Sequence, residues 1–313
     1  MTAPPVTSRR FTTPAGQLAA VHCAPPEDTD RGIAVVLVGG LAGSKEDFLP
    51  LLPLLARAGY HAYAYDHRGQ YESDGPDSPD AYTLHTLADD LRSILAQIDH
   101  PYGVHLAGLC MGGFVARHAA MSAPGVASLA LVGCPLGVSL GTYLRLRALA
   151  LSCRIIGPTR TARMVIDRFD KARPDEALDT ATADVARVRL TRTRPAHYFG
   201  LVRSWARVRH DGPLPAAPVP TLLLHGAKDS LFPTRLYVEA ARRTGATYMV
   251  VPQAGHSAHQ HRPEAVARAM QGFWQALPVP DPAVRPGRPA AGVLPSEACQ
   301  DLEAARSEGP QHR

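Results

Sequence analysis

The 313-residue sequence has no long hydrophobic run. Apolar residues make up 45% of the chain, yet no stretch of about 18 uninterrupted apolar residues occurs. We therefore predict neither a membrane span nor a membrane partner. The N-terminal segment MTAPPVTSRRFTTPAGQ has no apolar core of the kind found in a secretory signal peptide. We expect a cytoplasmic protein.

The usual motifs for disulfides, metals and nucleotides are also missing. The five cysteines are scattered and include no C-x-x-C pair, which argues against a zinc site or a disulfide framework. The fourteen histidines include no H-E-x-x-H arrangement. The closest grouping, His256, His259 and His261, could bind a metal ion, but we expect no metal and no organic cofactor. Neither G-x-G-x-x-G nor G-K-[ST] occurs, and no nucleic-acid recognition motif is present, so we predict no nucleic-acid partner.

The apolar residues that are present alternate between strand-like and helix-like patterns. GIAVVLVGG at 32–40 is a β-branched run ending in glycines, typical of a buried parallel strand. The segment 82–99 instead has helical spacing, with apolar residues at Leu84, Leu87, Leu91, Ile94, Leu95 and Ile98. Repeated strand–helix alternation predicts an α/β fold with a mostly parallel central sheet and helices on both faces. Residues 1–10 are predicted to be a loose end.

Two regions interrupt this alternation. Residues 137–211 look helical and carry 15 Lys and Arg against 7 Asp and Glu, a local net charge of +8. We predict that they form a helical cap inserted after the sixth strand, so that 11–136 and 212–277 make up the core. Residues 278–313 are rich in Pro, Gly, Ala and charge without periodicity, and we predict a disordered tail.

The stretch GLCMGG at 108–113 follows an apolar strand and precedes a predicted helix. Its outline is that of a nucleophile elbow, G-x-S-x-G, with Cys110 in the serine position. Gly108 and Gly112 supply the small neighbours that such a tight turn needs. The helix that follows would place its N–H groups and positive dipole end beside the thiol, which favours the thiolate. The alternative is a buried, inert cysteine.

Two more polar residues follow predicted strands. Asp229 comes after the strand at 220–226, in LLLHGAKDSLFP, and His256 comes after the strand at 246–251, in VVPQAGHSAHQHRPEAV. An aspartate in such a loop is often only a turn former. His259 and His261 compete with His256 for the role of base, and we expect His259 to line the cleft instead.

Taken together, these motifs resemble the cap-containing members of the α/β-hydrolase superfamily over residues 11–277. The order nucleophile Cys110, acid Asp229 and base His256 is that superfamily's order. The turn YAYDHRGQYES also resembles its Asp-x-Arg-Gly turn, in which Asp66 and Arg68 shape the loop. The resemblance implies a catalytic triad of these three residues.

The resemblance further implies an oxyanion hole made by two backbone N–H groups. Met111, the residue after the nucleophile, would supply one, and Leu41, which follows Gly39 and Gly40, would supply the other. The sequence departs from the usual pattern at Cys110 and at Gly39, where a histidine is common.

A cysteine nucleophile suits thioester exchange, because the acyl-enzyme is itself a thioester. We expect an acyl hydrolase or acyltransferase, with the acyl group presented by coenzyme A or an acyl carrier protein. The basic cap would attract phosphate, with Arg203 and Arg207 the favoured contacts. The alternatives are a carboxylesterase or lactonase, a non-catalytic binding protein on a hydrolase scaffold, and an engineered replacement of serine by cysteine.

Overall fold

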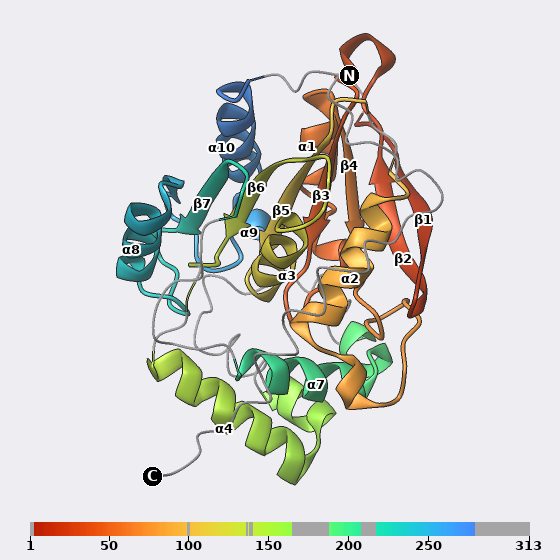
Figure 1. The fold of residues 1–313 in the computed structure, drawn as a ribbon, viewed down its shortest axis with the longest axis vertical. Helices are drawn as coiled ribbons and strands as arrows, with labels where there is room; N and C mark the ends of the chain where they lie inside the picture. The colour runs from red at the N-terminus through yellow and green to blue at the C-terminus, as the bar shows by residue number, and fades with distance from the viewer. Residues whose placement is uncertain are drawn as a thin grey trace, which may run out of the picture.

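The computed structural model describes residues 3–98, 101–135, 137, 140–164, 188–207 and 217–278. Within these ranges the chain forms an eight-stranded sheet in the order β1-β2-β4-β3-β5-β6-β7-β8 (Figure 1). The strands are β1 (Val6–Thr13), β2 (Gly16–Cys23), β3 (Ile33–Val38), β4 (Tyr60–Tyr65), β5 (Val104–Leu109), β6 (Val126–Val132), β7 (Thr221–Gly226) and β8 (Thr247–Val251).

The sheet is mostly parallel, as the sequence predicts. Among the described strands, only the β1–β2 and β2–β4 pairs are antiparallel. The pairs β3–β4, β3–β5, β5–β6, β6–β7 and β7–β8 are parallel. The prediction of a loose end over residues 1–10 is wrong for its second half, because β1 begins at Val6, which pairs with Cys23. Arg9 and Arg10 are exposed residues of this edge strand, where charged side chains are well tolerated.

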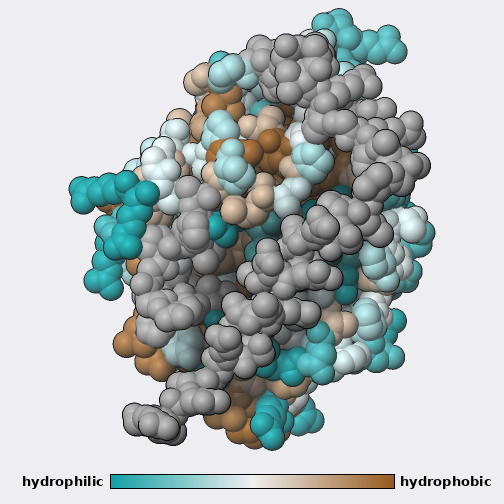
Figure 2. Space-filling model, in the orientation of Figure 1, coloured by the Kyte–Doolittle hydropathy of each residue, from teal (hydrophilic) through white to brown (hydrophobic). Residues whose placement is uncertain are grey.

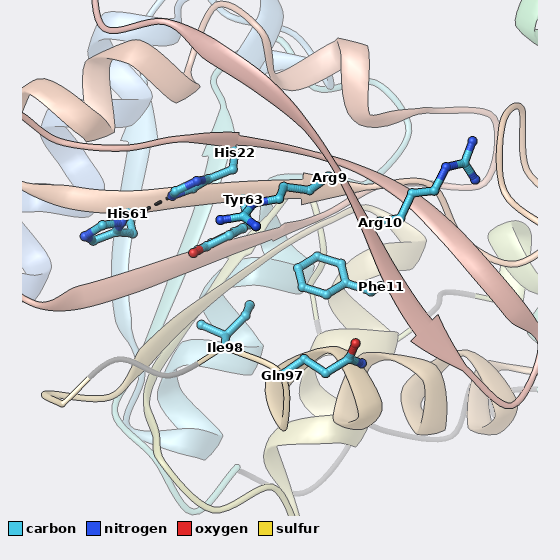
Figure 3. A pocket seen from close by; sticks show the side chains of 8 residues that line it. All are labelled: Arg9, Arg10, Phe11, His22, His61, Tyr63, Gln97 and Ile98. Carbon is cyan, nitrogen blue, oxygen red and sulfur yellow. Dashed lines mark hydrogen bonds between the residues drawn. The ribbon is translucent and has the colours of Figure 1, made fainter.

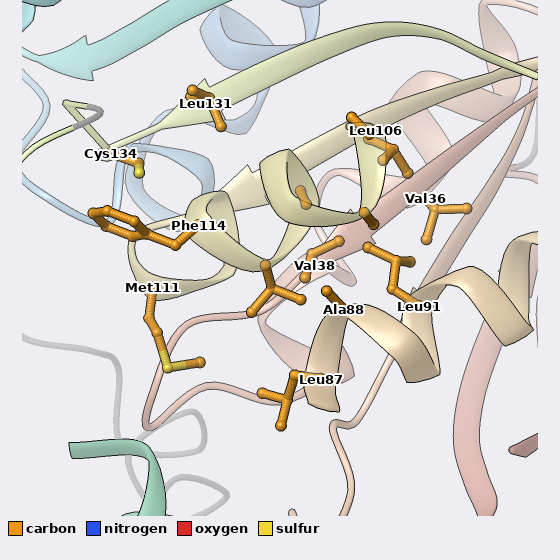
Figure 4. Close-up of a cluster of buried hydrophobic side chains, with 14 of the residues drawn as sticks. Val36, Val38, Leu87, Ala88, Leu91, Leu106, Met111, Phe114, Leu131 and Cys134 are labelled. Atoms are coloured by element: carbon orange, nitrogen blue, oxygen red, sulfur yellow. The ribbon is translucent and has the colours of Figure 1, made fainter. Parts of the chain in front are cut away.

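Helices cover both faces of the sheet (Figure 1). Successive residues of a strand point to opposite faces, and Val36 and Leu37 accordingly belong to two separate buried clusters. Figure 4 shows the cluster between the sheet and helices α2 and α3, and the other cluster includes residues of α1 and α10. The core helices are α1 (Leu52–Arg57), α2 (Leu84–Leu95), α3 (Met111–Ala120), α8 (Thr234–Thr244), α9 (Ala258–His261) and α10 (Pro263–Gln275), with short 3-10 turns η1 (Glu27–Thr29), η2 (Lys45–Phe48) and η3 (Pro79–Ala81).

Between β6 and β7 the chain leaves the sheet and forms helices. These are α4 (Leu140–Ile156) and α7 (Pro195–Trp205), with further helical residues at 158–164 and 188–192. Helices α4 and α7 pack together below the sheet in Figure 1. The described part of 137–211 contains no strand. The predicted tail, apart from residue 278, lies outside the described residues, as do 208–211.

The carboxyl ends of the parallel strands meet at one edge of the sheet. The loops after β3, β5, β7 and β8 therefore converge, as is usual for the ligand-binding edge of an open α/β sheet. These loops carry Leu41, Cys110, Asp229 and His256, four of the residues that the sequence singles out.

Candidate active site

Cys110 occupies a strained turn between strand β5 and helix α3. Its backbone has φ 51° and ψ −118°, and a non-glycine residue with positive φ is uncommon. Such a conformation costs on the order of 1–3 kcal/mol and persists where the surroundings enforce it. The N–H of Cys110 donates to the carbonyl of Val132 on β6 at 2.9 Å, which anchors the turn to the neighbouring strand. The turn places the thiol at the carboxyl end of β5, where it is partly exposed.

The glycines on either side of Cys110 are required by close packing. A Cβ on Gly108 would lie 2.5 Å from the carbonyl oxygen of Gly112, and a Cβ on Gly112 would lie 2.3 Å from the carbonyl oxygen of Gly39. Both distances are far below van der Waals contact, so helix α3 can approach β3 and β5 this closely only with glycine at both positions. The spacing G-x-C-x-G therefore has a steric cause.

Asp229 and His256 meet beside the elbow. Nδ1 of His256 donates to Oδ2 of Asp229 at 3.1 Å. The carboxylate is held by three further donors: the N–H groups of Leu231 at 2.8 Å and Phe232 at 3.3 Å, and the hydroxyl of Tyr237 at 3.0 Å. The side chain of Asp229 is only 1% exposed. Burial would raise the pKa of Asp229, but the hydrogen bond and charge of His256 and the two backbone donors lower it.

The other ring nitrogen of His256 is available to the nucleophile. With Nδ1 on Asp229, Nε2 forms no hydrogen bond within the described ranges. Burial would lower the pKa of His256, but the charges of Cys110 and Asp229 and the hydrogen bond to Asp229 outweigh burial and raise the pKa to about 10. The nearby charges of Cys110 and Asp229 therefore favour the protonated form of this imidazole.

Leu41 and Met111 both lie beside Cys110. Met111 is the first residue of α3, and a Cβ on Gly40, next to Leu41, would lie 3.5 Å from the Cβ of Cys110. Among the described residues, neither the N–H of Leu41 nor that of Met111 donates a hydrogen bond. Two backbone donors next to a nucleophile are what an oxyanion hole requires.

His67, which the sequence did not indicate as a site residue, stabilises the loop after β3 that carries Gly39 and Leu41. Its Nε2 donates to the carbonyl oxygen of Gly39 at 3.0 Å, and its own N–H donates to Oε1 of Gln70 at 2.9 Å. Burial lowers the pKa of His67 to about 4, so the ring is neutral. The only sequence signal was its place in the DHRG turn after a buried strand. Its contact with Gly39 spans 28 residues, which no local pattern reveals.

Arg68 and Asp66 shape this same turn through buried ion pairs. Arg68 donates to both carboxylate oxygens of Asp90, at 2.6 and 2.8 Å. Asp66 accepts from both the N–H and the Nζ of Lys45, at 2.8 and 2.9 Å. With their charges already engaged, these residues have the structural role that the resemblance implies.

The structure does not bring Arg203 to the elbow as a free cation. Its guanidinium forms an ion pair with Asp80 and lies 5.6 Å from the ring centre of Phe199. Arg207 is exposed just after α7. His259 is 2% exposed, and its ring centre lies 5.2 Å from that of Phe48. Burial and the adjacent charge of His256 lower the pKa of His259 to about 3, so it is uncharged.

Three arginines of the predicted cap bind carboxylates of the core. Arg189 lies 2.6 Å from Asp47, Arg194 pairs with Asp77, and Arg203 pairs with Asp80. The side chains of Arg189 and Asp47 are only 9% and 11% exposed. Part of the positive charge of residues 137–211 is therefore used to hold the helices on the core, and is not free to attract a ligand.

A cavity of about 410 Å³ lies beside strands β1, β2 and β4, and Figure 3 shows the residues that line it. His22 and His61 line it with their ring nitrogens 3.2 Å apart. None of the predicted site residues contributes to this lining, which consists of Arg9, Arg10, Phe11, His22, His61, Tyr63, Gln97 and Ile98. The cavity is therefore not the site at Cys110.

No helix in the described part of the chain is long and apolar enough to cross a membrane. In the same part, no three His, Cys, Asp or Glu side chains are placed to hold a metal ion together.

Comparison with known proteins identifies similar chains. The model of the Alpha/beta hydrolase family matches residues 35–269. RutD of Variovorax paradoxus, whose assigned carbamate hydrolysis is itself a proposal, is 41% identical over 103 residues, or 32% of this chain and 38% of RutD. EphD of Mycobacterium tuberculosis is 26% identical over 298 residues, which cover 85% of this chain and 49% of EphD. The chain thus spans less than half the length of these two relatives.

Among solved structures, the enol-lactonase of Burkholderia xenovorans LB400 superimposes with a TM-score of 0.69. The match covers 85% of this chain and 100% of the enol-lactonase, at 20% sequence identity. At this identity the likeness establishes the fold alone.

Proposed function

The chain belongs to the alpha/beta hydrolase family, and from that premise we propose that it cleaves esters or thioesters through an acyl intermediate on Cys110. The observation that carries the proposal is the strained elbow of Cys110 next to the His256–Asp229 pair. A nucleophile, a base and a group that orients the base are then present together, as covalent acyl transfer requires.

Acylation begins with attack of the Cys110 sulfur on the substrate carbonyl carbon. The carbonyl electron pair moves to its oxygen, and the N–H groups of Leu41 and Met111 stabilise the resulting oxyanion. When the tetrahedral intermediate collapses, the bond to the leaving group breaks and the imidazolium of His256 gives the leaving group a proton. The products are the free alcohol or thiol and an acyl group bound to Cys110 as a thioester.

Deacylation reverses these roles. Neutral His256 takes a proton from water, or from an amine or alcohol acceptor, as that molecule attacks the thioester. The Cys110 sulfur leaves as a thiolate and regenerates the ion pair with His256. Asp229 holds the imidazole with Nδ1–H toward itself throughout, so that Nε2 always faces the reacting atoms.

A thioester donor suits this nucleophile best. Exchange of one thioester for another changes the free energy little, and the acyl group on Cys110 remains activated toward an acceptor. We therefore propose an acyl group carried by coenzyme A or by an acyl carrier protein. Arg207, which is exposed after α7, is the candidate contact for the phosphate of such a carrier.

Intact-mass spectrometry tests the acyl-cysteine proposal. The protein is mixed with acyl-coenzyme A thioesters of several chain lengths, quenched with acid within the first turnover, and digested to locate the added mass. We expect one acyl group on Cys110 in the wild type, none in Cys110→Ala, and an unchanged adduct in the control Cys153→Ala, because Cys153 is buried in α4. Turnover that persists in Cys110→Ala would overturn the proposal.

A second candidate is a carboxylesterase or lactonase that acts on small neutral esters. The pairing of Arg189, Arg194 and Arg203 with core carboxylates favours it, because these arginines cannot attract phosphate freely. Matched substrates distinguish the two candidates, each offering the same acyl group as a coenzyme A thioester and as a simple alkyl ester. A larger kcat/KM for the thioester, reduced by Arg207→Ala, supports the carrier-linked substrate. If Arg207→Ala changes kcat/KM by the same factor for both substrates, the plain esterase is favoured.

A further inference from the structure

Helix α4 of the predicted cap turns an apolar stripe away from the protein. Leu140, Leu144, Leu151 and Ile155 are 56%, 56%, 57% and 70% exposed. Their spacings of four, seven and four residues place all of them on one side of an α-helix. Leu146, on the opposite side, is 6% exposed and faces the rest of the molecule. The exposed stripe is therefore separate from the apolar face that packs α4 against the rest of the protein.

Arginines flank the apolar stripe on both sides. A turn of 3.6 residues places Arg147 and Arg154 along one edge of the stripe and Arg145 along the other. All three are exposed. None of them forms an ion pair within the described residues, unlike the arginines that hold the cap on the core. Residues 137–164 contain five arginines and no Asp or Glu.

The surface has the dimensions and position of a docking face. At 1.5 Å per residue, the stripe from Leu140 to Ile155 is roughly 22 Å long. Figure 1 places α4 at the outer edge of the molecule, and Figure 2 shows hydrophobic side chains gathered along that edge with hydrophilic ones beside them. Isolated exposed leucines are ordinary on a protein surface, but an aligned set on one helix marks an interaction site.

We propose that α4 lies on an anionic lipid surface, with the apolar stripe in the acyl boundary and the arginines at the headgroup phosphates. A flat anionic surface contacts the stripe and both of its flanks at once, and long arginine side chains reach upward to phosphate while their stems stay apolar. The expectation of no membrane partner rested on the absence of a spanning segment, which does not bear on a helix that lies in the interface plane. The proposal is independent of the chemistry at Cys110.

Vesicle flotation of the full-length chain tests this proposal. One set of vesicles is pure phosphatidylcholine, and the other is an equimolar mixture of phosphatidylcholine and phosphatidylglycerol. We expect the wild type to float with the anionic vesicles and to remain unbound with the neutral ones. Binding should weaken as salt is added, because the attraction of a basic segment to anionic lipid falls off within a Debye length.

Two triple variants separate the apolar and charged contributions. Leu144→Ser, Leu151→Ser and Ile155→Ser together should reduce binding by more than about tenfold, because they remove the apolar anchor. Arg145→Gln, Arg147→Gln and Arg154→Gln together should reduce it by about a hundredfold, at about fivefold for each arginine near an anionic surface. Thermal unfolding confirms that each variant is folded, and the exposed positions make unchanged Tm values the expected result.

Matched controls carry the same chemical changes elsewhere. Arg235→Gln, Arg242→Gln and Arg268→Gln remove the same charge from other exposed positions. Leu49→Ser, Met121→Ser and Val250→Ser together remove three apolar side chains that are 41%, 46% and 42% exposed. Both controls should bind like the wild type.

Three outcomes would overturn the proposal. The first is a wild type that binds neither vesicle. The second is binding that the α4 variants and the controls weaken equally, since net charge would then explain it. The third is a concentration-dependent dimer without lipid, measured by sedimentation, that the serine variant dissociates. In that case the stripe is an interface between two copies of the chain.

Discussion

Oδ2 of Asp229 and Nδ1 of His256 lie 3.1 Å apart, although 27 residues separate them in the sequence. The contact fixes which ring nitrogen faces Cys110, because a neutral imidazole that donates through Nδ1 keeps Nε2 as its acceptor. Asp229 therefore sets the tautomer and orientation of the base, and it need not accept a proton itself.

Asp229→Asn should preserve the fold and cut turnover. The amide oxygen can still accept from the N–H groups of Leu231 and Phe232, as Oδ1 does now, so we expect little change in Tm. The amide NH₂ would face Nδ1 and favour the wrong tautomer, which should lower kcat by roughly 10²–10⁴-fold. Unchanged steady-state kinetics would mean that another carboxylate orients the base. Asp66 would then be tested next, followed by Asp211, which lies outside the described residues.

The titration of His256 should depend on Cys110. Burial lowers the pKa of His256, but Cys110 and Asp229 together raise it to about 10. Cys110→Ala removes the contribution of Cys110 to this rise, so the pKa of His256 measured by NMR of the imidazole signals should fall. A raised pKa stabilises the fold most below the unfolded value of about 6.5, and this stabilisation is lost as the pH rises through about 10. The stability advantage of the wild type over Cys110→Ala should therefore shrink between these pH values. Equal pKa values in the two proteins would show that no ion pair forms.

Cys110 should be the first described cysteine to react with iodoacetamide at neutral pH. Cys23, Cys134 and Cys153 are buried, whereas Cys110 is partly exposed at the start of α3 and beside His256. Burial also raises the pKa of the Cys23 and Cys153 thiols. Peptide mapping during a short reaction measures the order of labelling, and Cys299→Ser serves as the background because Cys299 lies outside the described residues. Uniform labelling would contradict an activated thiol.

The sequence was sufficient to predict the parts of the fold that depend on local pattern. The continuous apolar run of β3 predicted a buried parallel strand, and the glycines around Cys110 predicted the tight turn that φ 51° confirms. Asp229 and His256 converge because the loops after parallel strands share one edge, which topology alone predicts. The start of β1 at Val6 was missed, because an exposed edge strand has too few buried residues to produce a strong pattern.

Contacts between distant segments could not be predicted from the sequence. The charge of the cap was visible, but its use was not, since Arg189 and Asp47 are 142 residues apart. The same holds for His67, whose bond to Gly39 depends on the parallel pairing of β3 with β4. A count of charges indicates how much charge a surface carries, but a partner is identified only when the fold is known.

His67 should act as a positioning residue for the loop that carries Leu41. In His67→Ala the carbonyl of Gly39 loses its 3.0 Å hydrogen bond, and the Leu41 N–H should move away from the developing oxyanion. Loss of an entire oxyanion donor costs about 10²–10³-fold in kcat, so we expect a smaller loss, with little change in KM. His67→Gln, whose amide can donate, should recover part of the activity.

The pH profile distinguishes positioning from proton transfer by His67. Burial lowers the pKa of His67 to about 4, so the ring is neutral across the working range. The pH dependence of kcat/KM in His67→Ala should therefore keep the shape of the wild-type curve. A shifted curve would mean that His67 exchanges protons with the substrate.

The arginines that join the cap to the core should differ greatly in their contribution to stability. Arg189 donates at 3.1 Å to the hydroxyl of Ser44 and lies 2.6 Å from Asp47, with both members of the ion pair largely buried. Arg189→Ala leaves the Asp47 carboxylate without its main partner, and removal of one member of a buried pair costs about 3–5 kcal/mol. Urea unfolding measures this loss.

Arg203→Ala is the matched control, because its partner Asp80 is 80% exposed and can be hydrated by water. A surface ion pair contributes about 0–1 kcal/mol, so the free energy of unfolding should hardly change. In a double-mutant cycle, Arg189→Ala with Asp47→Ala should show strong coupling, whereas Arg203→Ala with Asp80→Ala should be nearly additive. Added salt should weaken the Arg203 pair more than the Arg189 pair, since water and ions reach only the former. Equal losses from both single variants would mean that the cap is held by its apolar contacts, and that the buried ion pair adds no stability of its own.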